Sequence, residues 1–266
     1  MKNDLTLLTK KAVEATHLRL FLDYDGTLAE FAPSPDTILP DPELIVLFQE
    51  LVETPGVLPV VISGRRLSHI QKLLPVKGLF LAGTYGLEMQ LPGGQLRNSL
   101  PYEKVRPTIE SLLPQWRKLI ENHTGFYLED KGWSIALHGR YAAQPKLSMV
   151  MKAARSAAQE LLPGSDFRLS VNERFLELAP STANKAVAVQ WILNELTPQN
   201  ALSLYFGDDD KDEEGFIPVI ESGGYAVRVT TKYTISISQF QISNPEEVRS
   251  WLTNLIQAKN IISAEI

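Results

Sequence analysis

Short apolar runs recur along the chain, and their length and composition are typical of strands that are buried on both faces of a sheet. Segments with the spacing of amphipathic helices separate several of these runs. The runs are Leu18–Leu22, Val57–Ile62, Leu79–Ala82, Leu202–Phe206 and Tyr225–Val229. Because strands that alternate with helices form parallel sheets with helices on both faces, these parts of the sequence predict a doubly wound α/β fold of Rossmann type.

The helices between these runs are marked by their ends. A proline followed by an acid opens a helix at Pro42 and another at Pro245, where Asn244 is the capping residue. Two further helices are expected over Leu67–Leu74 and Ala183–Leu196. Helices therefore fill the connections that a parallel sheet requires.

The middle of the chain has a different order of elements. A helical segment is followed by two strand-like runs, and the same order then repeats. The segments are Val105–Glu121, Gly125–Glu129, Trp133–His138, Lys146–Leu162, Phe167–Val171 and Phe175–Leu178. This αββαββ order predicts an inserted antiparallel α+β domain with its helices on one face. We expect a core made of residues 1–102 and 180–266, with the insert at 103–179.

Composition and charge narrow the kind of protein. The 266 residues are 44% hydrophobic and 21% charged, which is ordinary for a globular fold. The net charge of −5 argues against a nucleic-acid or membrane partner, so an anionic substrate must be received by local cations. There is no cysteine, which excludes disulfides and sulfur-based zinc sites. The segment Met1–His17 resembles neither a secretory signal nor a membrane span. We expect a cytoplasmic protein, and no obligate protein partner is evident.

Two carboxylates follow the first predicted strand directly, in the sequence Asp23-Tyr24-Asp25-Gly26-Thr27. Open α/β sheets bind ligands at the carboxyl ends of their strands, which is where these acids are expected. A solvated turn is the alternative, since Asp-Gly is common in turns. The remaining motifs decide between the two.

Ser63, Gly64 and Arg65 follow the second strand in the equivalent place. They offer a hydroxyl, a glycine that permits close backbone approach, and a guanidinium suited to oxyanions. Lys185 lies in the first turn of the helix that re-enters the sheet. Alone it would be a surface charge, unless anions converge on it.

A dense acidic segment, Gly207-Asp208-Asp209-Asp210-Lys211-Asp212-Glu213, follows the strand Leu202–Phe206. Hard oxygen ligands crowded at a strand end suit Mg²⁺, which takes one or two carboxylates together with phosphate and water. A helix N-terminus, where the dipole favours acids, accounts for only some of them. The segment therefore indicates a metal site.

In chain order these elements resemble the signature of the haloacid dehalogenase superfamily, whose motifs are Asp-x-Asp-x-Thr, a serine or threonine, a lysine, and Gly-Asp-Asp-x-x-Asp. The resemblance implies a Mg²⁺-dependent phosphatase in which Asp23 forms an aspartyl phosphate. Asp25 would protonate the leaving oxygen and then activate water. Ser63 and Lys185 would hold the phosphoryl oxygens that are not transferred.

The same resemblance implies the metal ligands. They would be Asp23, Asp208 and the backbone carbonyl of Asp25. Asp212 would orient Lys185 or a metal-bound water. Asp209 has either a similar supporting role or a structural one.

From Leu20 through Phe216 the chain is also similar to trehalose-6-phosphate phosphatases. The similarity is carried by Phe21–Leu28, Ile62–Arg65, Gly86–Glu88, Leu128–Gly132, Ala136–His138 and Asn184-Lys185. It implies a hydrolase of trehalose biosynthesis that converts trehalose 6-phosphate to trehalose and phosphate, with the insert as its cap domain.

In that family two cap acids and a cap lysine bind the sugar that carries no phosphate. The matching positions are Glu129, Lys131 and Glu177. Carboxylates and an ammonium group suit a substrate made of hydroxyls. Without the resemblance, Glu129 and Lys131 would be read as a surface pair, because strand alternation alone places both on one face.

Three positions depart from the family pattern. Tyr85 replaces a histidine, Lys211 replaces a threonine, and Gly139-Arg140 follows His138 where tyrosine and arginine are usual. None of these changes removes a catalytic group. All of them lie near places that shape substrate choice.

Other functions therefore stay open. A phosphatase for glucosyl- or mannosyl-3-phosphoglycerate, or for sucrose phosphate, would use the same core, with Arg140, Lys146 and Arg168 as candidate extra cations. A non-catalytic sugar-phosphate binder would be expected to have lost its nucleophile. A phosphotransferase or mutase usually has a smaller, helical cap.

Overall fold

The computed structural model describes residues 5–31, 38–196, 198–232 and 234–264. The chain divides into two compact units. We call residues 1–97 together with 184–266 the core unit, and residues 98–183 the inserted unit. Among the described residues, no helix combines the length and the apolar composition that crossing a membrane requires. The two units are described in turn.

The core unit is built on an eight-stranded sheet with the order β12-β11-β10-β1-β2-β3-β4-β5. The strands are β1 (Leu18–Leu22), β2 (Val57–Ile62), β3 (Phe80–Gly83), β4 (Glu88–Gln90), β5 (Leu96–Asn98), β10 (Leu202–Gly207), β11 (Tyr225–Val229) and β12 (Phe240–Ile242). β1 lies between β10 and β2 and pairs with both in parallel, and only at β4 does the direction reverse. The carboxyl ends of β1, β2 and β10 therefore meet at one edge of the sheet.

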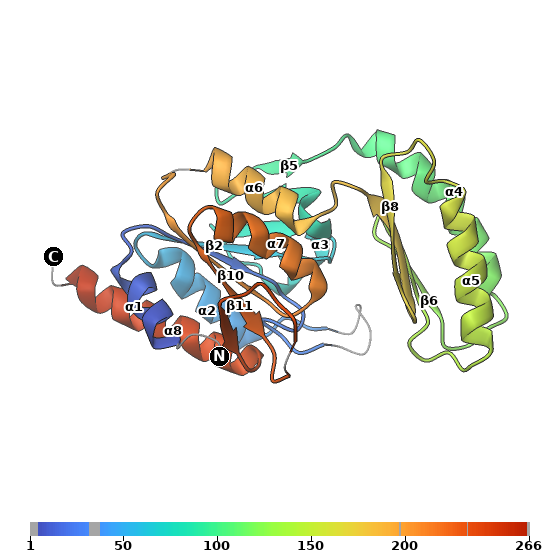
Figure 1. Ribbon diagram of the computed structural model, residues 1–266. Helices are drawn as coiled ribbons and strands as arrows, with labels where there is room; N and C mark the ends of the chain where they lie inside the picture. Colours follow the sequence, from blue (N-terminus) through green and yellow to red (C-terminus); the bar gives the residue numbers. More distant parts are fainter. Residues whose placement is uncertain (1–4, 32–37, 197, 233, 265–266) are drawn as a thin grey trace. The chain divides into compact units, whose positions relative to one another are not determined.

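Helices cover both faces of this sheet (Figure 1). They are α1 (Leu5–Glu14), α2 (Pro42–Glu53), α3 (Leu67–Leu73), α6 (Lys185–Glu195), α7 (Asp210–Glu221) and α8 (Pro245–Ala264), and a 3₁₀ turn, η2, lies at Thr84–Gly86. Strand alternation sends Leu20 and Leu22 to the face of α2 and α8, and Phe21 to the face of α6 and α7. Each face thus has its own apolar core.

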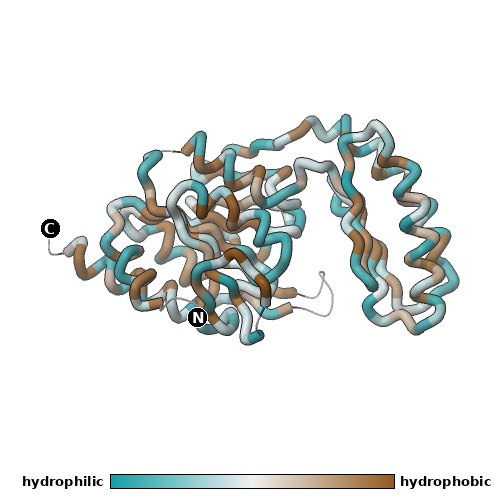
Figure 2. Tube along the Cα trace, in the orientation of Figure 1, coloured by the Kyte–Doolittle hydropathy of each residue, from teal (hydrophilic) through white to brown (hydrophobic). Residues whose placement is uncertain are grey.

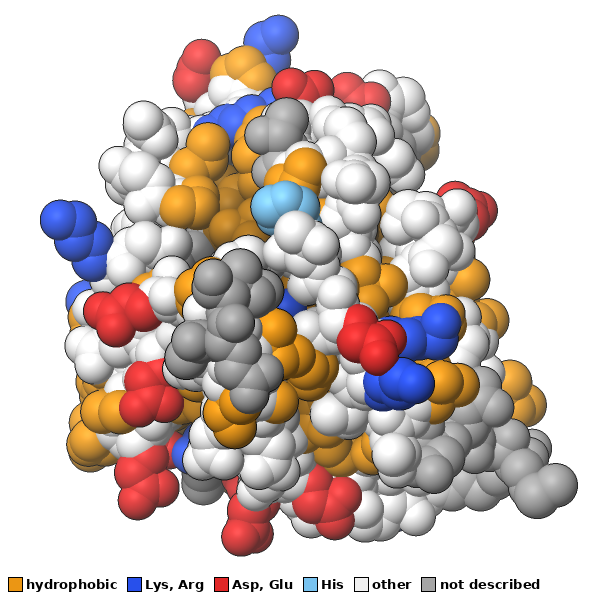
Figure 3. All heavy atoms as spheres, turned by 90° about the vertical axis from the view of Figure 1, so that its left-hand side faces the viewer, with side chains coloured by type: hydrophobic (Ala, Val, Ile, Leu, Met, Phe, Trp, Pro, Cys, Tyr) orange, Lys and Arg blue, Asp and Glu red, His pale blue; other side chains and the backbone are white. Residues whose placement is uncertain are grey.

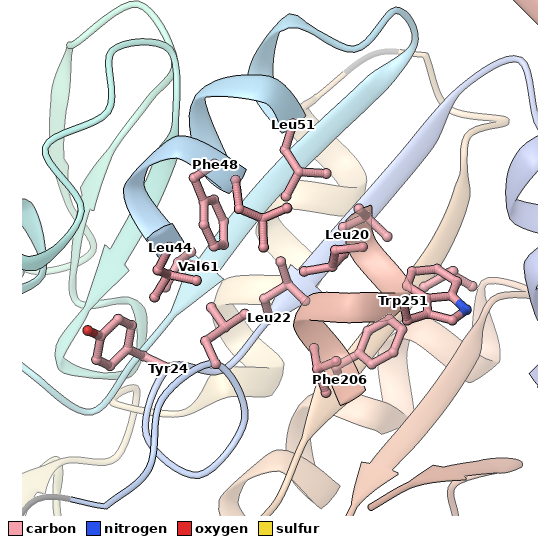
Figure 4. Packing of buried hydrophobic residues seen from close by; sticks show 14 of the residues in the cluster. Leu20, Leu22, Tyr24, Leu44, Phe48, Leu51, Val61, Phe206 and Trp251 are labelled. Atoms are coloured by element: carbon pink, nitrogen blue, oxygen red, sulfur yellow. The ribbon is translucent and has the colours of Figure 1, made fainter. Parts of the chain in front are cut away.

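Figure 4 shows the first of these cores. Leu44, Phe48 and Leu51 of α2 lie one turn apart and point at Leu20 and Leu22 of β1. All five side chains are almost fully buried. Burial of this kind, at about 25 cal/mol per Å² of apolar surface, fixes the strand that carries the first two acids.

The distribution of polarity agrees with this architecture. In Figure 2 the central strands of the core unit are mostly hydrophobic, whereas the exposed turns are hydrophilic. On the face shown in Figure 3, acidic and basic side chains are interspersed with neutral ones and form no patch of a single sign.

The inserted unit contains α4 (Tyr102–Ile120), β6 (Tyr127–Asp130), β7 (Ile135–His138), α5 (Lys146–Gln159), β8 (Phe167–Asn172) and β9 (Phe175–Pro180). Its strands form an antiparallel sheet of order β6-β7-β9-β8. Both helices lie on one face of that sheet (Figure 1). The indole N–H of Trp116 in α4 donates to the carbonyl of Ala154 in α5 at 2.9 Å, which ties the two helices together.

The predicted α/β class, with a doubly wound core and an α+β insert, is confirmed. The sequence did not predict α7, β4, β5 or β12. The last three are three-residue strands, too short to show a periodicity. α7 opens with charged residues that obscure its apolar face, and Pro218 lies within it.

Candidate active site

Four predicted residues come together at the carboxyl edge of the core sheet. Asp23 follows β1, Ser63 follows β2 and Asp208 follows β10, while Lys185 is the first residue of α6, which Asn184 caps through its side chain. Parallel pairing of β1 with its two neighbours forces these strand ends together. The fold alone thus gathers side chains that are remote in sequence.

Lys185 is the centre of a buried ion network. Its Nζ donates to Asp23 Oδ1 and to Asp212 Oδ1, each at 2.6 Å. Burial disfavours the ammonium form, but the two carboxylates outweigh it and raise the pKa of Lys185 well above its usual value. Lys185 is therefore a fixed cation beside Asp23.

Asp23, Asp208 and Asp212 form an acidic cluster in which one carboxylate oxygen from each lies within 4.8 Å of the others. Burial, together with Asp212 and Asp209, raises the pKa of Asp208 to about 7. Burial also raises the pKa of Asp23 well above its usual value, although Lys185 opposes the shift. One lysine does not balance this much negative charge, and hard oxygen donors with excess charge fit a divalent cation.

The hydrogen bonds of Asp212 distinguish it from the other two members of the acidic cluster. Asp212 Oδ1 accepts from Lys185 and from the Tyr205 hydroxyl, the latter at 2.9 Å, and its Oδ2 accepts from the backbone N–H groups of Asp208 and Asp209. Both oxygens of Asp212 are thus engaged by the protein. Asp23 and Asp208 are the members better placed to hold a cation.

Gly26 explains how Asp208 approaches the first loop. Its φ is +85°, and a Cβ at this position would lie 2.4 Å from the Asp208 carboxylate. Only glycine accepts both the conformation and the contact. The Asp-Gly pair of the first motif is therefore a steric requirement of the site, beyond ordinary turn formation.

Asp25 is paired with Arg65. The guanidinium donates from Nε and Nη2 to the two carboxylate oxygens, each at 2.7 Å. The backbone N–H of Arg65 donates to Ser63 Oγ at 3.1 Å. Arg65 thus lies against the first loop, next to the position expected for phosphate, and fixes the orientation of Asp25.

Asp209 is the N-cap of α7. Its side chain accepts from the backbone N–H groups of Lys211 and Asp212, and Asp212 accepts from Asp209 N in return, which makes a capping box. Arg228 of β11 donates to the Asp209 carbonyl and to Glu213. These contacts hold the loop that carries Asp208.

A second buried cluster lies on the sheet of the inserted unit and contains the three predicted sugar-binding positions. Lys131 Nζ lies 2.9 Å from Glu177 Oε1 and 4.0 Å from Glu129 Oε2. His138 contacts Glu129 at 3.0 Å, and the Ser134 hydroxyl donates to Glu177 at 3.1 Å. Burial would raise the pKa of Glu129, but His138 and Lys131 outweigh it and lower that pKa. We call these five residues the inserted-unit cluster.

Several residues that support these sites were not predicted from the sequence. Tyr205 was predicted only to be part of a buried strand. No motif in the sequence marked Ser134 as a functional residue. His138 stood in a motif quoted for the family resemblance, which was a usable signal. A phenol near the end of a buried strand, close in sequence to an acidic segment, could have identified Tyr205.

The positions that depart from the family pattern lie in both units. Tyr85 and Lys211 contact each other in the core unit. In the inserted unit, Gly139 packs closely against Leu147, and a Cβ at this position would lie 2.5 Å from a methyl of that leucine. Arg168, a candidate extra cation, donates to the backbone carbonyl of Ala183 at 2.6 Å.

Comparisons with known proteins identify the family of the chain. The trehalose-phosphatase family model matches residues 21–250. The trehalose-phosphate phosphatase of Mycobacterium marinum is 28% identical over 208 residues, which are 77% of this chain and 52% of that protein. This chain thus spans about half the length of that relative.

A probable trehalose-phosphate phosphatase of Sinorhizobium fredii is 26% identical over 253 residues, covering 93% of this chain and 91% of that one. The C-terminal domain of a Candida albicans trehalose-6-phosphate phosphatase has the same fold, with a TM-score of 0.80, 21% identity, and coverage of 96% and 97%. The matched family segment includes both clusters and the whole inserted unit. The chain belongs to the trehalose-phosphatase family.

Proposed function

We propose that this protein hydrolyses trehalose 6-phosphate to trehalose and inorganic phosphate through an aspartyl phosphate on Asp23. The observation that carries the proposal is the buried Asp23 carboxylate, held 2.6 Å from the Lys185 ammonium and beside Asp208. A carboxylate is a weak nucleophile toward an anion. Neighbouring cations make the attack possible because they neutralise the repulsion between the two.

The reaction proceeds in two displacements. One oxygen of Asp23 attacks phosphorus as the bond from phosphorus to the sugar oxygen breaks, and Asp25 gives a proton to that leaving oxygen. Water then attacks the aspartyl phosphate, Asp25 takes its proton, and phosphate leaves with Asp23 restored. Arg65 holds Asp25 in one orientation through two hydrogen bonds.

Ser63, Gly64 and Lys185 form the phosphate-binding side of the site. The Ser63 hydroxyl and the Lys185 ammonium bind the phosphoryl oxygens that are not transferred. Gly64 lets the backbone of its loop approach them. Lys185 is kept charged for this task by Asp212, which is fully buried.

Mg²⁺ is the proposed cofactor. Asp23, Asp208 and the backbone carbonyl of Asp25 would hold it, and it supplies positive charge where negative charge grows on the phosphoryl group. Burial and acidic neighbours raise the pKa values of Asp23 and Asp208, and a bound divalent cation would offset this concentration of negative charge. Asp212 and Asp209 support the site through Lys185 and the cap of α7.

The two units divide the work in this proposal. The core, residues 1–102 and 180–266, carries the chemistry, and the insert, 103–179, binds the sugar that carries no phosphate. Glu129, Lys131 and Glu177 would bind its hydroxyls. Lys131 offsets part of the charge of the two carboxylates, and a neutral polyol can bind to these groups without bringing a counter-ion.

The test is phosphate release with Mg²⁺ present or chelated. The substrates are trehalose 6-phosphate, sucrose 6-phosphate, glucosyl- and mannosyl-3-phosphoglycerate, and glucose 6-phosphate. We expect metal-dependent release with a strong preference for trehalose 6-phosphate. A preference for another glycoside would retain the chemistry and reassign the substrate, for which the departures at Tyr85, Gly139 and Lys211 give a reason. Failure to release phosphate from any of them would contradict the proposal.

A further inference from the structure

The turn η2, Thr84–Gly86, has an unusual backbone next to the phosphate side of the site. Thr84 and Tyr85 have φ values of 46° and 58°, which are left-handed conformations that side chains other than glycine rarely adopt. Such residues are unfavourable in free energy and persist where the surroundings fix them. The contacts around η2 are therefore expected to hold this conformation in place.

Backbone hydrogen bonds fix the turn to the loop that carries Ser63. Tyr85 N donates to the Ser63 carbonyl at 2.9 Å, and Thr84 N donates to the Arg65 carbonyl at 2.6 Å. The Tyr85 ring covers Gly64 so closely that a Cβ there would lie 2.7 Å from the ring and its hydroxyl. A side chain at position 64 would therefore overlap the Tyr85 ring.

The same turn also contacts the two helices that carry the charged groups. A Cβ on Gly86 would lie 2.3 Å from the Cβ of Ala188 in α6, the helix that begins at Lys185. In α7, Lys211 Nζ hydrogen-bonds to the Tyr85 hydroxyl and lies 4.0 Å from the centre of its ring. Tyr85 thus joins the Ser63 loop to the first turn of α7, directly beside Asp212.

We propose that Tyr85 and Lys211 are positioning residues, whose contact sets the separation between the Ser63–Arg65 loop and the acidic cluster. The transferred phosphoryl group must fit between these two parts, so their separation controls how Asp23 meets phosphorus. A displacement of about 1 Å in such an arrangement can cost about 100-fold in rate. This inference rests on the proposed phosphatase function.

The physical basis is a pair of complementary contacts. The ammonium of Lys211 forms a charge-assisted hydrogen bond with the phenol and a cation–π contact with its ring. Tyr85 is buried, and the backbone hydrogen bonds of Thr84 and Tyr85 to the Ser63–Arg65 loop prevent Tyr85 from following Lys211 elsewhere. Both residues depart from the family pattern and they touch each other, so neither can be changed without affecting the other.

The experiment compares Tyr85→Phe, Lys211→Met and the double variant with wild type, on trehalose 6-phosphate and on p-nitrophenyl phosphate. Tyr85→Phe keeps the ring over Gly64 and removes the hydroxyl, and Lys211→Met keeps most of the stem. Lys72→Met, on the exposed side of α3, is the matched control. Thermal unfolding is measured for every variant.

We expect each single variant to lower kcat about 10-fold with little change in KM, and by the same factor on both substrates, because the phosphoryl group is common to them. In the double variant kcat should fall no further than in the more affected single variant, because both substitutions remove the same contact.

Unchanged kcat with a lower unfolding temperature would mean that the pair is only structural and would overturn the inference. So would losses that multiply in the double variant, or a loss confined to one substrate. If Tyr85→Phe does not fold, Lys211→Met decides alone, since it alters a partly exposed side chain. Wild-type protein that hydrolyses neither substrate would overturn the proposed function as well.

Discussion

The acidic cluster of the core unit and the inserted-unit cluster are both buried groups of charged side chains, and they differ in charge balance. In the first, Lys185 faces several carboxylates, and the pKa of Asp208 is raised to about 7 by burial and by its acidic neighbours. In the second, Lys131 and His138 face Glu129 and Glu177, and the pKa of Glu129 is lowered despite burial. The first cluster has one lysine for three carboxylates, whereas the second has one lysine for two carboxylates, which Ser134 and His138 also contact through hydrogen bonds.

This difference follows from where the clusters lie. The acidic cluster is at strand ends, where loops and helix N-termini bring acids and backbone N–H groups together. In the inserted-unit cluster, Glu129 and Glu177 lie on antiparallel strands with Ala136 between them in the register, and Lys131 of the β6–β7 turn lies near both carboxylates. Strand ends thus collect several acids, whereas in the inserted unit the cation comes from a turn beside the strands. The acidic cluster suits a metal-dependent step, and the inserted-unit cluster suits recognition of a neutral sugar.

The largest effect should come from Asp23→Asn. Removing the nucleophile should lower turnover at least about 1000-fold on every substrate. Without metal, the variant should unfold at or above the wild-type temperature, because burial already makes the Asp23 carboxylate unfavourable in the folded state. Rapid-quench assays and thermal unfolding check the two parts. Activity like that of wild type would refute the assignment of Asp23.

The next largest effect should come from Mg²⁺ binding, which should depend on the acidic cluster and not on the inserted-unit cluster. Saturating Mg²⁺, at about 100 times its Kd, should stabilise wild type by about 2.7 kcal/mol, which calorimetry measures as a rise in the unfolding temperature. Asp208→Asn should remove that rise, and Glu129→Gln should keep it. An equal response in both variants would mean that the acidic cluster does not hold the ion.

Glu129→Ala should have a smaller and selective effect. Loss of a buried charged hydrogen-bonding group costs about 1.5–3 kcal/mol, so kcat/KM for trehalose 6-phosphate should fall roughly 10- to 100-fold. Hydrolysis of p-nitrophenyl phosphate should be nearly unchanged. Glu103→Ala, on the exposed side of α4, is the control. Equal losses on both substrates would argue against a sugar-binding role.

The smallest effect should come from a partly exposed ion pair outside both clusters. Asp41 caps α2 and accepts from Arg249 Nη1 at 2.6 Å. Asp41→Ala should lower the free energy of unfolding by about 1 kcal/mol, measured by urea denaturation. Burial would raise the pKa of Asp41, but Arg249 and the cap hydrogen bonds lower it below 3.8. Its contribution should therefore be present above that pH and disappear as the pH falls through the lowered pKa. A wild-type–variant difference that stays constant down to pH 2 would contradict this account.

Much of the core was predictable because one physical rule covers it. Buried parallel strands are continuous apolar runs, and their carboxyl ends meet, so Asp23, Ser63 and Asp208 could be placed together from sequence. Asp212 as the partner of Lys185 was anticipated, and the structure shows that contact. The order of elements in the insert was predictable for a different reason. Its helical and strand-like segments each showed their own hydrophobic period.

The remaining contacts depend on rotamers and packing that no local pattern encodes. Arg65 pairs with Asp25, 40 positions away, instead of lying open toward a ligand. Tyr85 and Lys211 are 126 positions apart, and each was visible only as a departure from a family pattern. Tyr205 looked apolar because its ring packs in the core while its hydroxyl reaches Asp212. Tertiary structure creates these contacts.

The pairing of β1 with β10 has a consequence for the order in which the protein folds. Asp23 and Lys185 are 162 positions apart, and the inserted unit lies between them. During synthesis, β1 must remain without its β10 partner until the insert has emerged, and closing so long a loop is entropically costly. An insert that packs as a compact unit of its own shortens the effective loop, because fewer flexible residues then separate β1 from β10. The domain proposed to select the sugar would then also help to assemble the catalytic centre.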